Sequence, residues 1–225
     1  MTSEELKFFD NIASKWDSME HRSTPAKINE ILDIVGVGEG WDVLDLGTGT
    51  GVLVPYLSER VGPKGSVLGI DLSDGMLREA RRKYGNLGNV MFEKRDFEAS
   101  PLPGRYDLIM MYCVYPHLQR PYETLGRLVE DNLKPGGRII IGFPSDEKFI
   151  NSIHAEKKVD HDHLPQADIL TLRFAVNCLH SRKIVADEGK YLVEVYPEDE
   201  CVREVTKRIA SEIIPEQSRC EVKVS

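Results

Sequence analysis

The chain has 225 residues, of which 41% are hydrophobic and 29% are charged, and its formal net charge at pH 7 is −8. This length suits one substantial domain and is short for two. The negative charge argues against wholesale binding of nucleic acid or of an anionic membrane surface.

The cysteines and the first residues indicate an intracellular setting. Four cysteines occur without any CxxC spacing: Cys113, Cys178, Cys201 and Cys220. They predict reduced thiols and not a disulfide framework or a zinc site. The first residues are acidic and lack an apolar core, so they predict no signal peptide, and no apolar run has membrane-spanning length. We therefore expect a cytoplasmic protein that binds no membrane.

Residues 6–20 have a helical pattern with Phe8, Phe9, Ile12 and Trp16 on one side. The plain interpretation is an amphipathic helix packed against the domain.

A second helix is predicted from Thr24-Pro25 to Val35, because threonine caps helices and proline favours their first position. Glycines from Gly36 to Gly40 then interrupt the chain before a strand over 41–46.

Three glycines at alternate positions follow this strand: Gly47, Gly49 and Gly51. A helical pattern over 52–60 comes next, so the layout predicts a strand, a tight turn and a helix N-terminus. The dinucleotide fingerprint would need a glycine where Val52 stands, which disfavours a nicotinamide-dependent oxidoreductase. A turn that only joins a strand to a helix remains the simpler alternative.

With Asp45 two residues before the first glycine, the stretch resembles motif I of the class I S-adenosylmethionine-dependent methyltransferases. The resemblance implies that Asp45, Gly47, Thr48, Gly49 and Gly51 hold the amino-acid end and the sulfonium side of that cofactor. A carboxylate such as Asp45 would repel a phosphate but suits a cationic sulfonium and ammonium.

A second strand is predicted over 66–72 and ends at Asp71 and Leu72. An acid at this position accepts hydrogen bonds from ribose hydroxyls in nucleotide-binding folds, although Asp71 also suits a helix-capping turn. The following helix, 74–84, places Met76 early enough to reach an adenine ring.

A third strand, 90–95, is followed by Asp96 and Phe97. The resemblance implies that Asp96 accepts a hydrogen bond from the adenine amino group and that Phe97 contacts the ring. Acids at the ends of three successive strands are more specific for a nucleoside ligand than any one of them.

An apolar strand over 105–114 is expected to be buried on both faces, as in a parallel sheet. Residues from Tyr112 to His117 should then lie beside the transferred methyl group. Many family members have an asparagine near the position of Tyr112, so this chain departs from the family there. His117 matches the histidine that many members have near its position. We expect Tyr112 to contact the cofactor, Tyr115 to face the substrate and His117 to serve as a general base, with a structural histidine as the alternative.

The opening stretch, from Phe9-Asp10 through Ile12-Ala13 to Trp16-Asp17, resembles that of the small-molecule methyltransferases grouped with ubiquinone and menaquinone biosynthesis enzymes. The resemblance implies that the N-terminal part closes over the cofactor and helps to exclude water.

The rest of the chain resembles the family less closely after residue 143. Its predicted elements are a helix over 118–133, a turn at 134–137, a strand over 138–143, a polar connection over 144–164, a helix over 165–179, hairpin strands over 181–187 and 190–196, and a helix over 199–214.

Long polar connections at the carboxyl edge of a sheet commonly hold substrate-facing residues, so we expect His154, His161 and His163 to face the acceptor. A metal held by these histidines with Asp160 or Asp162 is a less favoured hypothesis, because the spacing matches no metal motif.

The sequence thus predicts one α/β domain over 1–225: a Rossmann-like, seven-stranded, mostly parallel sheet with helices on both faces and an antiparallel last strand. Its parts are an N-terminal helical lid (1–35), a substrate-side insertion and helix (144–180) and a C-terminal helix and tail (198–225). The predicted cofactor is S-adenosylmethionine and the predicted partner is a small-molecule methyl acceptor. A nucleoside-binding protein without methyl-transfer activity is the alternative, and the oligomeric state is open, with a homodimer as one option.

Overall fold

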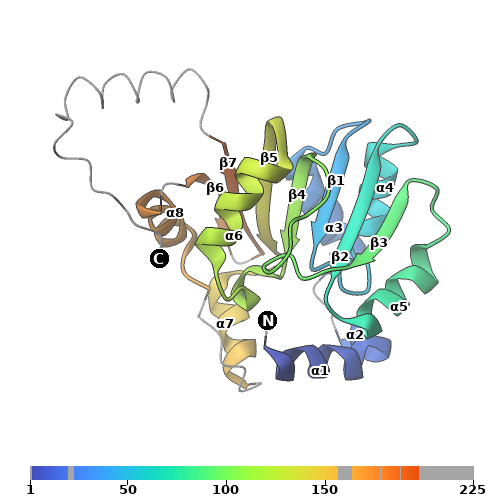
Figure 1. Ribbon diagram of the computed structural model, residues 1–225. Helices are drawn as coiled ribbons and strands as arrows, with labels where there is room; N and C mark the ends of the chain where they lie inside the picture. The colour runs from blue at the N-terminus through green and yellow to red at the C-terminus, as the bar shows by residue number, and fades with distance from the viewer. Residues whose placement is uncertain (1, 20–22, 157–163, 178, 188, 198–225) are drawn as a thin grey trace, which may run out of the picture.

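The computed structural model describes residues 2–19, 23–156, 164–177, 179–187 and 189–197. In this part of the chain, seven strands form one sheet in the order β3-β2-β1-β4-β5-β7-β6 (Figure 1). The strands from β1 to β5 pair in parallel, whereas β7 is antiparallel to both β5 and β6. This arrangement confirms the predicted mostly parallel sheet with a reversed last strand.

The strands are β1 Asp42–Leu46, β2 Ser66–Asp71, β3 Val90–Lys94, β4 Tyr106–Tyr112, β5 Leu133–Phe143, β6 His180–Asp187 and β7 Lys190–Tyr196. The helices are α1 Ser3–Ile12, α2 Trp16–Met19, α3 Pro25–Val35, α4 Val54–Val61, α5 Asp74–Tyr84, α6 Pro121–Arg127, α7 Glu147–Glu156 and α8 Ala167–Val176. Shorter turns are the 3₁₀ segments η1 Ala13–Lys15 and η2 Tyr115–His117 and the π-helical segment η3 Leu128–Asn132. Among the described residues, no helix is long and apolar enough to span a membrane.

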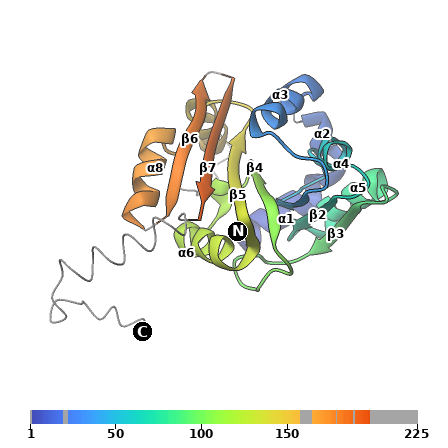
Figure 2. The same ribbon diagram turned by 90° about the horizontal axis from the view of Figure 1, so that it is seen from above.

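Helices cover both faces of the sheet, which explains the continuous apolar runs of its strands. Side chains alternate along β4, so that Leu108 and Met110 join the core beneath α3 and α4. Ile109 and Met111 point the other way, into the core beneath α6 and α8. Figure 2 shows the two layers of helices, with α3 and α4 on one side of the sheet and α6 and α8 on the other.

The N-terminal helix differs from the predicted helix over 6–20. It begins at Ser3 because Thr2 and Glu5 form a capping box, in which each side chain accepts a hydrogen bond from the other's backbone N–H. The helix is interrupted at η1 before α2 begins. Phe8, predicted to lie on the packed side, is 39% exposed.

The predicted helix over 118–133 is also wrong in its details. Regular α-helix covers only α6, because Pro121 occupies its first turn and the chain widens into the π-helical η3. The predicted turn at 134–137 lies inside β5, where the pairing with β4 shifts register and Gly136 has φ 76°. Tyr106 pairs with Leu133 and Leu108 pairs with Arg138, so the residues of the expected turn form an irregularity in the pairing of β4 with β5.

The expected polar connection over 144–164 contains helix α7, and Asp146 accepts a hydrogen bond from the backbone N–H of Phe149 at its start (2.8 Å). His154 lies in α7, whereas His161 and His163 lie outside the described residues. The predicted helix over 199–214 also lies outside them. Two smaller corrections concern α4, which begins two residues later than predicted, and β4, which ends at Tyr112.

Candidate active site

The carboxyl ends of the central parallel strands meet the N-terminal segment at one edge of the sheet. Figure 1 shows α1 and α2 lying across this edge, between α7 and α5. Hydrogen bonds join the segment to the glycine loop, to α5 and to η2, as described below. These bonds hold the N-terminal segment against three separate stretches of the chain at this edge of the sheet.

The glycine loop is fixed by main-chain contacts. The backbone N–H groups of Gly47 and Thr48 donate to the carbonyl of Ile70 at the end of β2 (2.8 and 3.0 Å). Gly47 has φ 68°, and a Cβ there would lie 2.4 Å from a methyl of Val114. Gly49 has φ 55°, but no atom lies within 4 Å of the place where its Cβ would be. The loop therefore leaves open space over Gly49 that a ligand can use.

Asp45 lies beneath this loop and is only 2% exposed. The Thr48 hydroxyl donates a hydrogen bond to its carboxylate at 2.6 Å. Burial raises the pKa of Asp45 to about 7, against the opposing effect of the Thr48 hydrogen bond, and the charge of Asp71 raises it further. A positively charged group bound nearby would stabilise the ionised form of this buried acid.

Asp71 ends β2, as predicted, beside the glycine loop. Its carboxylate accepts hydrogen bonds from the backbone N–H groups of Gly49 (2.9 Å) and Ser73 (2.8 Å). Burial raises the pKa of Asp71 in spite of these bonds. Ser73 in turn caps α5 by accepting the N–H of Met76, whose side chain is buried. Leu72 lies between Asp71 and Ser73 and is half-buried.

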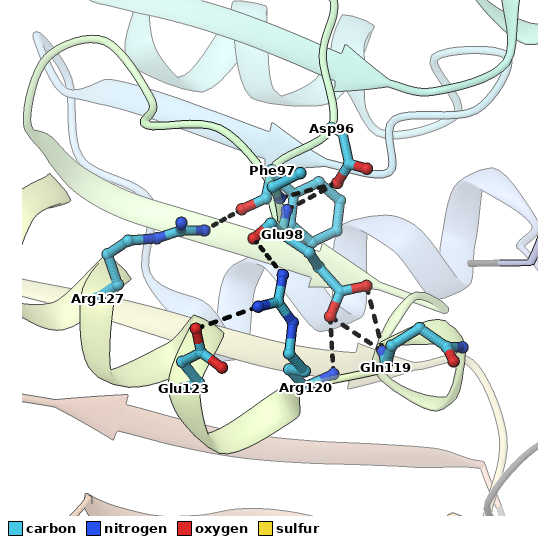
Figure 3. Close-up of polar contacts among 8 residues, drawn as sticks. Asp96, Phe97, Glu98, Gln119, Arg120, Glu123 and Arg127 are labelled. Carbon is cyan, nitrogen blue, oxygen red and sulfur yellow. Dashed lines mark hydrogen bonds and ion pairs between the residues drawn. The ribbon is translucent and has the colours of Figure 1, made fainter. Parts of the chain in front are cut away.

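Asp96 and Phe97 lie in the loop after β3, as the sequence predicted, and this loop is tied to α6 (Figure 3). One oxygen of Asp96 accepts the backbone N–H groups of Glu98 (2.9 Å) and Ala99 (3.1 Å). The carboxylate of Glu98 accepts the N–H groups of Gln119 and Arg120 before α6, and Arg127 donates to the carbonyl of Phe97. Asp96 thus shapes its own turn, and Glu98 couples that turn to the chain that follows η2.

The end of β4 is held in an unusual conformation. Cys113 has φ 59°, a value that residues with a Cβ rarely adopt, and its N–H donates to the carbonyl of Gly142 (2.8 Å). Tyr112 is buried, and its hydroxyl lies 3.1 Å from the hydroxyl of Ser23 ahead of α3. The structure therefore places Tyr112 in contact with the chain before α3, and its predicted role at the cofactor stays a prediction.

His117, the predicted general base, ends η2 and faces α1. Its Nδ1 lies 3.0 Å from Oε1 of Glu5, and its imidazole is 20% exposed. The ring of Phe9 packs edge-on against it with the ring centroids 5.5 Å apart. The N-terminal segment thus contacts this histidine through both a charged and an aromatic side chain.

Two further carboxylates anchor the N-terminal segment. Asp10 accepts hydrogen bonds from the Ser73 hydroxyl (2.6 Å) and the Gly75 N–H (2.8 Å), which lower the pKa of Asp10. Asp17 accepts from the Thr50 hydroxyl (2.6 Å) and from Lys83. Burial alone would raise the pKa of Asp17, but these two hydrogen bonds outweigh it and lower the pKa.

A cavity of about 440 Å³ opens beside η2, between the start of α6 and α8. Tyr115, Tyr122 and Pro165 line it, together with the exposed Arg173. Tyr115 is the one predicted substrate-facing residue whose side chain the structure describes. Among the described residues, no group of three or more potential metal-ligating side chains occurs, and the hypothetical metal site at 154–163 falls largely outside them.

The sequence interpretation missed four polar residues at this edge: Glu5, Asp10, Asp17 and Thr50. The Thr2-x-x-Glu5 spacing of a capping box is a signal for the start of α1. Asp10 and Asp17 belong to the opening stretch that resembles known methyltransferases, but its spacing does not indicate what these two residues bind.

Comparison with known proteins decides the family. The sequence model of a family described as a methyltransferase domain matches residues 38–198. The chain belongs to this methyltransferase family. The match confirms the predicted class I S-adenosylmethionine-dependent methyltransferase fold and family, with S-adenosylmethionine as the family's cofactor.

Individual relatives agree with this assignment. A 37.1 kDa protein of transposon TN4556 from Streptomyces fradiae is 32% identical over 142 residues, which are 63% of this chain and 39% of that protein. The ubiquinone/menaquinone biosynthesis C-methyltransferase UbiE of Pasteurella multocida is 34% identical over 142 residues, which are 59% of this chain and 52% of that protein. The chain thus matches about half or less of the length of these relatives.

Solved structures share the fold. A SAM-dependent methyltransferase from Aquifex aeolicus superposes with a TM-score of 0.63 and 25% identity, over 81% of this chain and 97% of that one. The DhpI–SAH complex superposes with a TM-score of 0.66 and 21% identity, over 85% of this chain and 94% of that one.

The geometry of this methyltransferase-family chain fits the cofactor. The open space over Gly49 lies beside Asp71, and the buried Asp45 lies beneath the loop, where a bound cation would stabilise its ionised form. Carboxylates of this kind suit hydroxyl donors and a cationic ligand and oppose a phosphate. A nicotinamide dinucleotide, the rival ligand, would bring a pyrophosphate to this position.

Proposed function

We propose that this protein transfers a methyl group from S-adenosylmethionine to a small-molecule acceptor. The observation that carries the proposal is the open space over Gly49, bordered by Asp71 and underlain by Asp45, in a chain of the methyltransferase family. The bound cofactor supplies a methyl group on a positively charged sulfur, which is already activated for transfer.

The protein's own contribution is then positioning. Asp71 accepts hydrogen bonds from the ribose hydroxyls, and the backbone of the glycine loop holds the amino-acid end over Asp45. Fixed geometry of this kind lowers barriers by about 7–11 kcal/mol in favourable cases. The N-terminal segment, anchored by Asp10 and Asp17, covers this edge of the sheet and excludes water.

His117 is the candidate general base that takes a proton from the acceptor. It lies at the same edge as the glycine loop, within the segment that follows β4. Its contact with Glu5 provides the carboxylate partner that catalytic histidines commonly have.

The acceptor enters, in this proposal, through the cavity beside η2. A volume of about 440 Å³ suits a small molecule rather than a macromolecular surface. Tyr115 and Tyr122 provide aromatic walls, and Arg173 provides a cation at the rim whose side chain has no hydrogen-bond or ion-pair partner among the described residues. An acceptor with a planar apolar body and an acidic substituent fits these walls. The named activity of the UbiE relatives makes quinone-type rings the first class to test.

Transfer of labelled methyl from S-adenosylmethionine tests the proposal on a panel of small acceptors that contains quinone-type rings and aromatic acids. We expect turnover on a member of this panel, and a KM at least about fivefold higher for an anionic acceptor in Arg173→Met. Lys148→Met, on a neighbouring helix, is the matched control. Tight binding of S-adenosylhomocysteine without turnover on any acceptor would favour a nucleoside-binding protein instead.

A further inference from the structure

Glu5 makes a contact that a surface helix does not need. It occupies the third position of α1, yet its side chain is only 8% exposed because it points at His117, 112 residues away in the sequence. Burying a carboxylate is costly unless it is hydrogen-bonded, so the site must provide partners for both oxygens.

Both oxygens of Glu5 have partners. Oε2 accepts the backbone N–H of Thr2 at 2.6 Å, which completes the capping box, and Oε1 lies 3.0 Å from Nδ1 of His117. A carboxylate only accepts hydrogen bonds, so the hydrogen-bond network assigns the imidazole proton to Nδ1. The other ring nitrogen, Nε2, is then the basic one.

Packing fixes the ring as well as its tautomer. Phe9, one turn after Glu5 on α1, meets the imidazole edge-on, and Trp16 packs edge-on against Phe9 with the ring centroids 5.6 Å apart. The rest of the segment is held by two contacts. Asp10 of α1 accepts a hydrogen bond from α5, and Asp17 of α2 accepts one from the glycine loop. Docking of the segment on the cofactor site therefore also brings Glu5 and Phe9 to His117.

We propose that Glu5 is a positioning residue for His117, so that the general base is complete only when the N-terminal segment is docked. The proposal rests on the proposed function, because it assigns Glu5 to the base of that reaction. Glu5 orients the imidazole, holds its proton on Nδ1 and stabilises the positive charge that the ring gains when it takes a proton from the acceptor. Docking of the N-terminal segment then both excludes water from the site and completes the general base.

The substitution Glu5→Gln separates this role from helix capping. Glutamine has one accepting oxygen, and when that oxygen accepts the Thr2 N–H its NH₂ group faces His117. An NH₂ group donates, so Nδ1 must become the acceptor and the proton moves to Nε2. The helix start is kept, whereas the ring nitrogen without a proton is then Nδ1, which contacts residue 5, and no longer Nε2.

The test measures three quantities on the full chain. Nitrogen-15 spectra of the protein with S-adenosylhomocysteine, assigned with His117→Gln, report which ring nitrogen carries the proton. We expect the Nδ1–H form in the wild type and the Nε2–H form in Glu5→Gln. We expect kcat to fall about 10- to 100-fold with KM nearly unchanged on the panel compound that gives turnover, and S-adenosylhomocysteine affinity to stay within about twofold.

Two controls separate positioning from structure. Glu4→Gln removes a neighbouring exposed acid and should change none of the three quantities. Thr2→Val removes the side-chain half of the capping box while it leaves the Glu5 carboxylate in place, so the Nδ1–H form should persist. An unchanged tautomer in Glu5→Gln, or an unchanged kcat, would overturn the proposal. A wild-type protein without turnover refutes the proposed function itself, which is a different result.

Discussion

The glycine loop and the N-terminal segment border the same site but are held in different ways. Main-chain bonds from Gly47 and Thr48 to Ile70 set the loop between two buried parallel strands. The N-terminal segment reaches the site through three carboxylates, Glu5, Asp10 and Asp17. Backbone bonding inside a sheet persists as long as the domain is folded, whereas a few side-chain contacts can be broken separately.

This difference assigns the two regions different tasks. The loop is a permanent part of the fold, so it can hold a cofactor in one geometry. The segment can leave without unfolding the sheet, because among the described residues it adds few side chains to the two buried cores. A site that must admit and release a ligand needs a fixed part that holds the ligand and a part that can move away.

Deletion of residues 1–20 should have the largest effect. It removes all three carboxylates and the cover over the site, so we expect turnover to fall at least about 100-fold. The melting temperature should fall by no more than about 5 °C, because the sheet and its two cores remain. Thermal melts and methyl-transfer assays measure these effects side by side. A truncated protein that melts far earlier but still turns over normally would show that the segment is only a packing element.

Asp71→Asn tests the side of the site that is formed by the glycine loop and the end of β2. Loss of the charged acceptor for the ribose hydroxyls should weaken S-adenosylhomocysteine binding by about 1.5–3 kcal/mol, or about 10- to 150-fold by calorimetry. Asp74→Asn, three residues later on the exposed start of α5, is the matched control. Equal affinity in the two variants would remove the ribose assignment from Asp71.

Asp45→Asn should change stability in a pH-dependent way. Because burial raises the pKa of Asp45 to about 7, the folded protein holds a proton there between about pH 4 and pH 7 that the unfolded chain releases. Stability from this group is therefore present below about pH 4 and is lost as the pH rises to about 7. The asparagine variant avoids this loss, and we expect it to be more stable than the wild type by about 1–3 kcal/mol at pH 8, with little difference at pH 4.

Urea unfolding at the two pH values, without ligand, measures the difference. Parallel pH dependence in the wild type and Asp45→Asn would contradict the raised pKa.

Asp10→Asn should have the smallest effect. It removes one charged contact between the segment and α5, which is worth about 1 kcal/mol, so docking should weaken about fivefold. The lowered pKa of Asp10 means that this contact persists above about pH 4 and is lost as the pH falls through the folded-state pKa. Trp16 fluorescence reports docking, and an Asp10→Asn signal identical to the wild type at every pH would exclude the anchor role.

The same comparison explains what the sequence allowed us to predict. Asp45, the three glycines and Asp71 follow a local spacing, and parallel strands bring their carboxyl ends to one edge, so their place could be inferred. The contact of Glu5 with His117 joins residues 112 positions apart and leaves no spacing pattern. The turn of Asp96 and its link through Glu98 to α6 depend on how two loops pack, and propensity does not encode that packing.

Errors in the elements have the same origin. The break at η1 lets Phe9 and Trp16 pack together while Asp17 reaches Thr50, and this tertiary arrangement overrides the helical pattern over 6–20. The irregularity at the start of β5 depends on the pairing of Tyr106 with Leu133 and of Leu108 with Arg138. In both places, contacts with distant residues decide the local conformation.

Calorimetric titration with S-adenosylhomocysteine, and with NADH in a parallel run, tests the central claim most directly. We expect one molecule of S-adenosylhomocysteine to bind per chain and NADH to give no binding heat, because the buried carboxylate beneath the glycine loop suits a cationic ligand and opposes a pyrophosphate. Absence of S-adenosylhomocysteine binding, or binding of NADH in its place, would contradict the account.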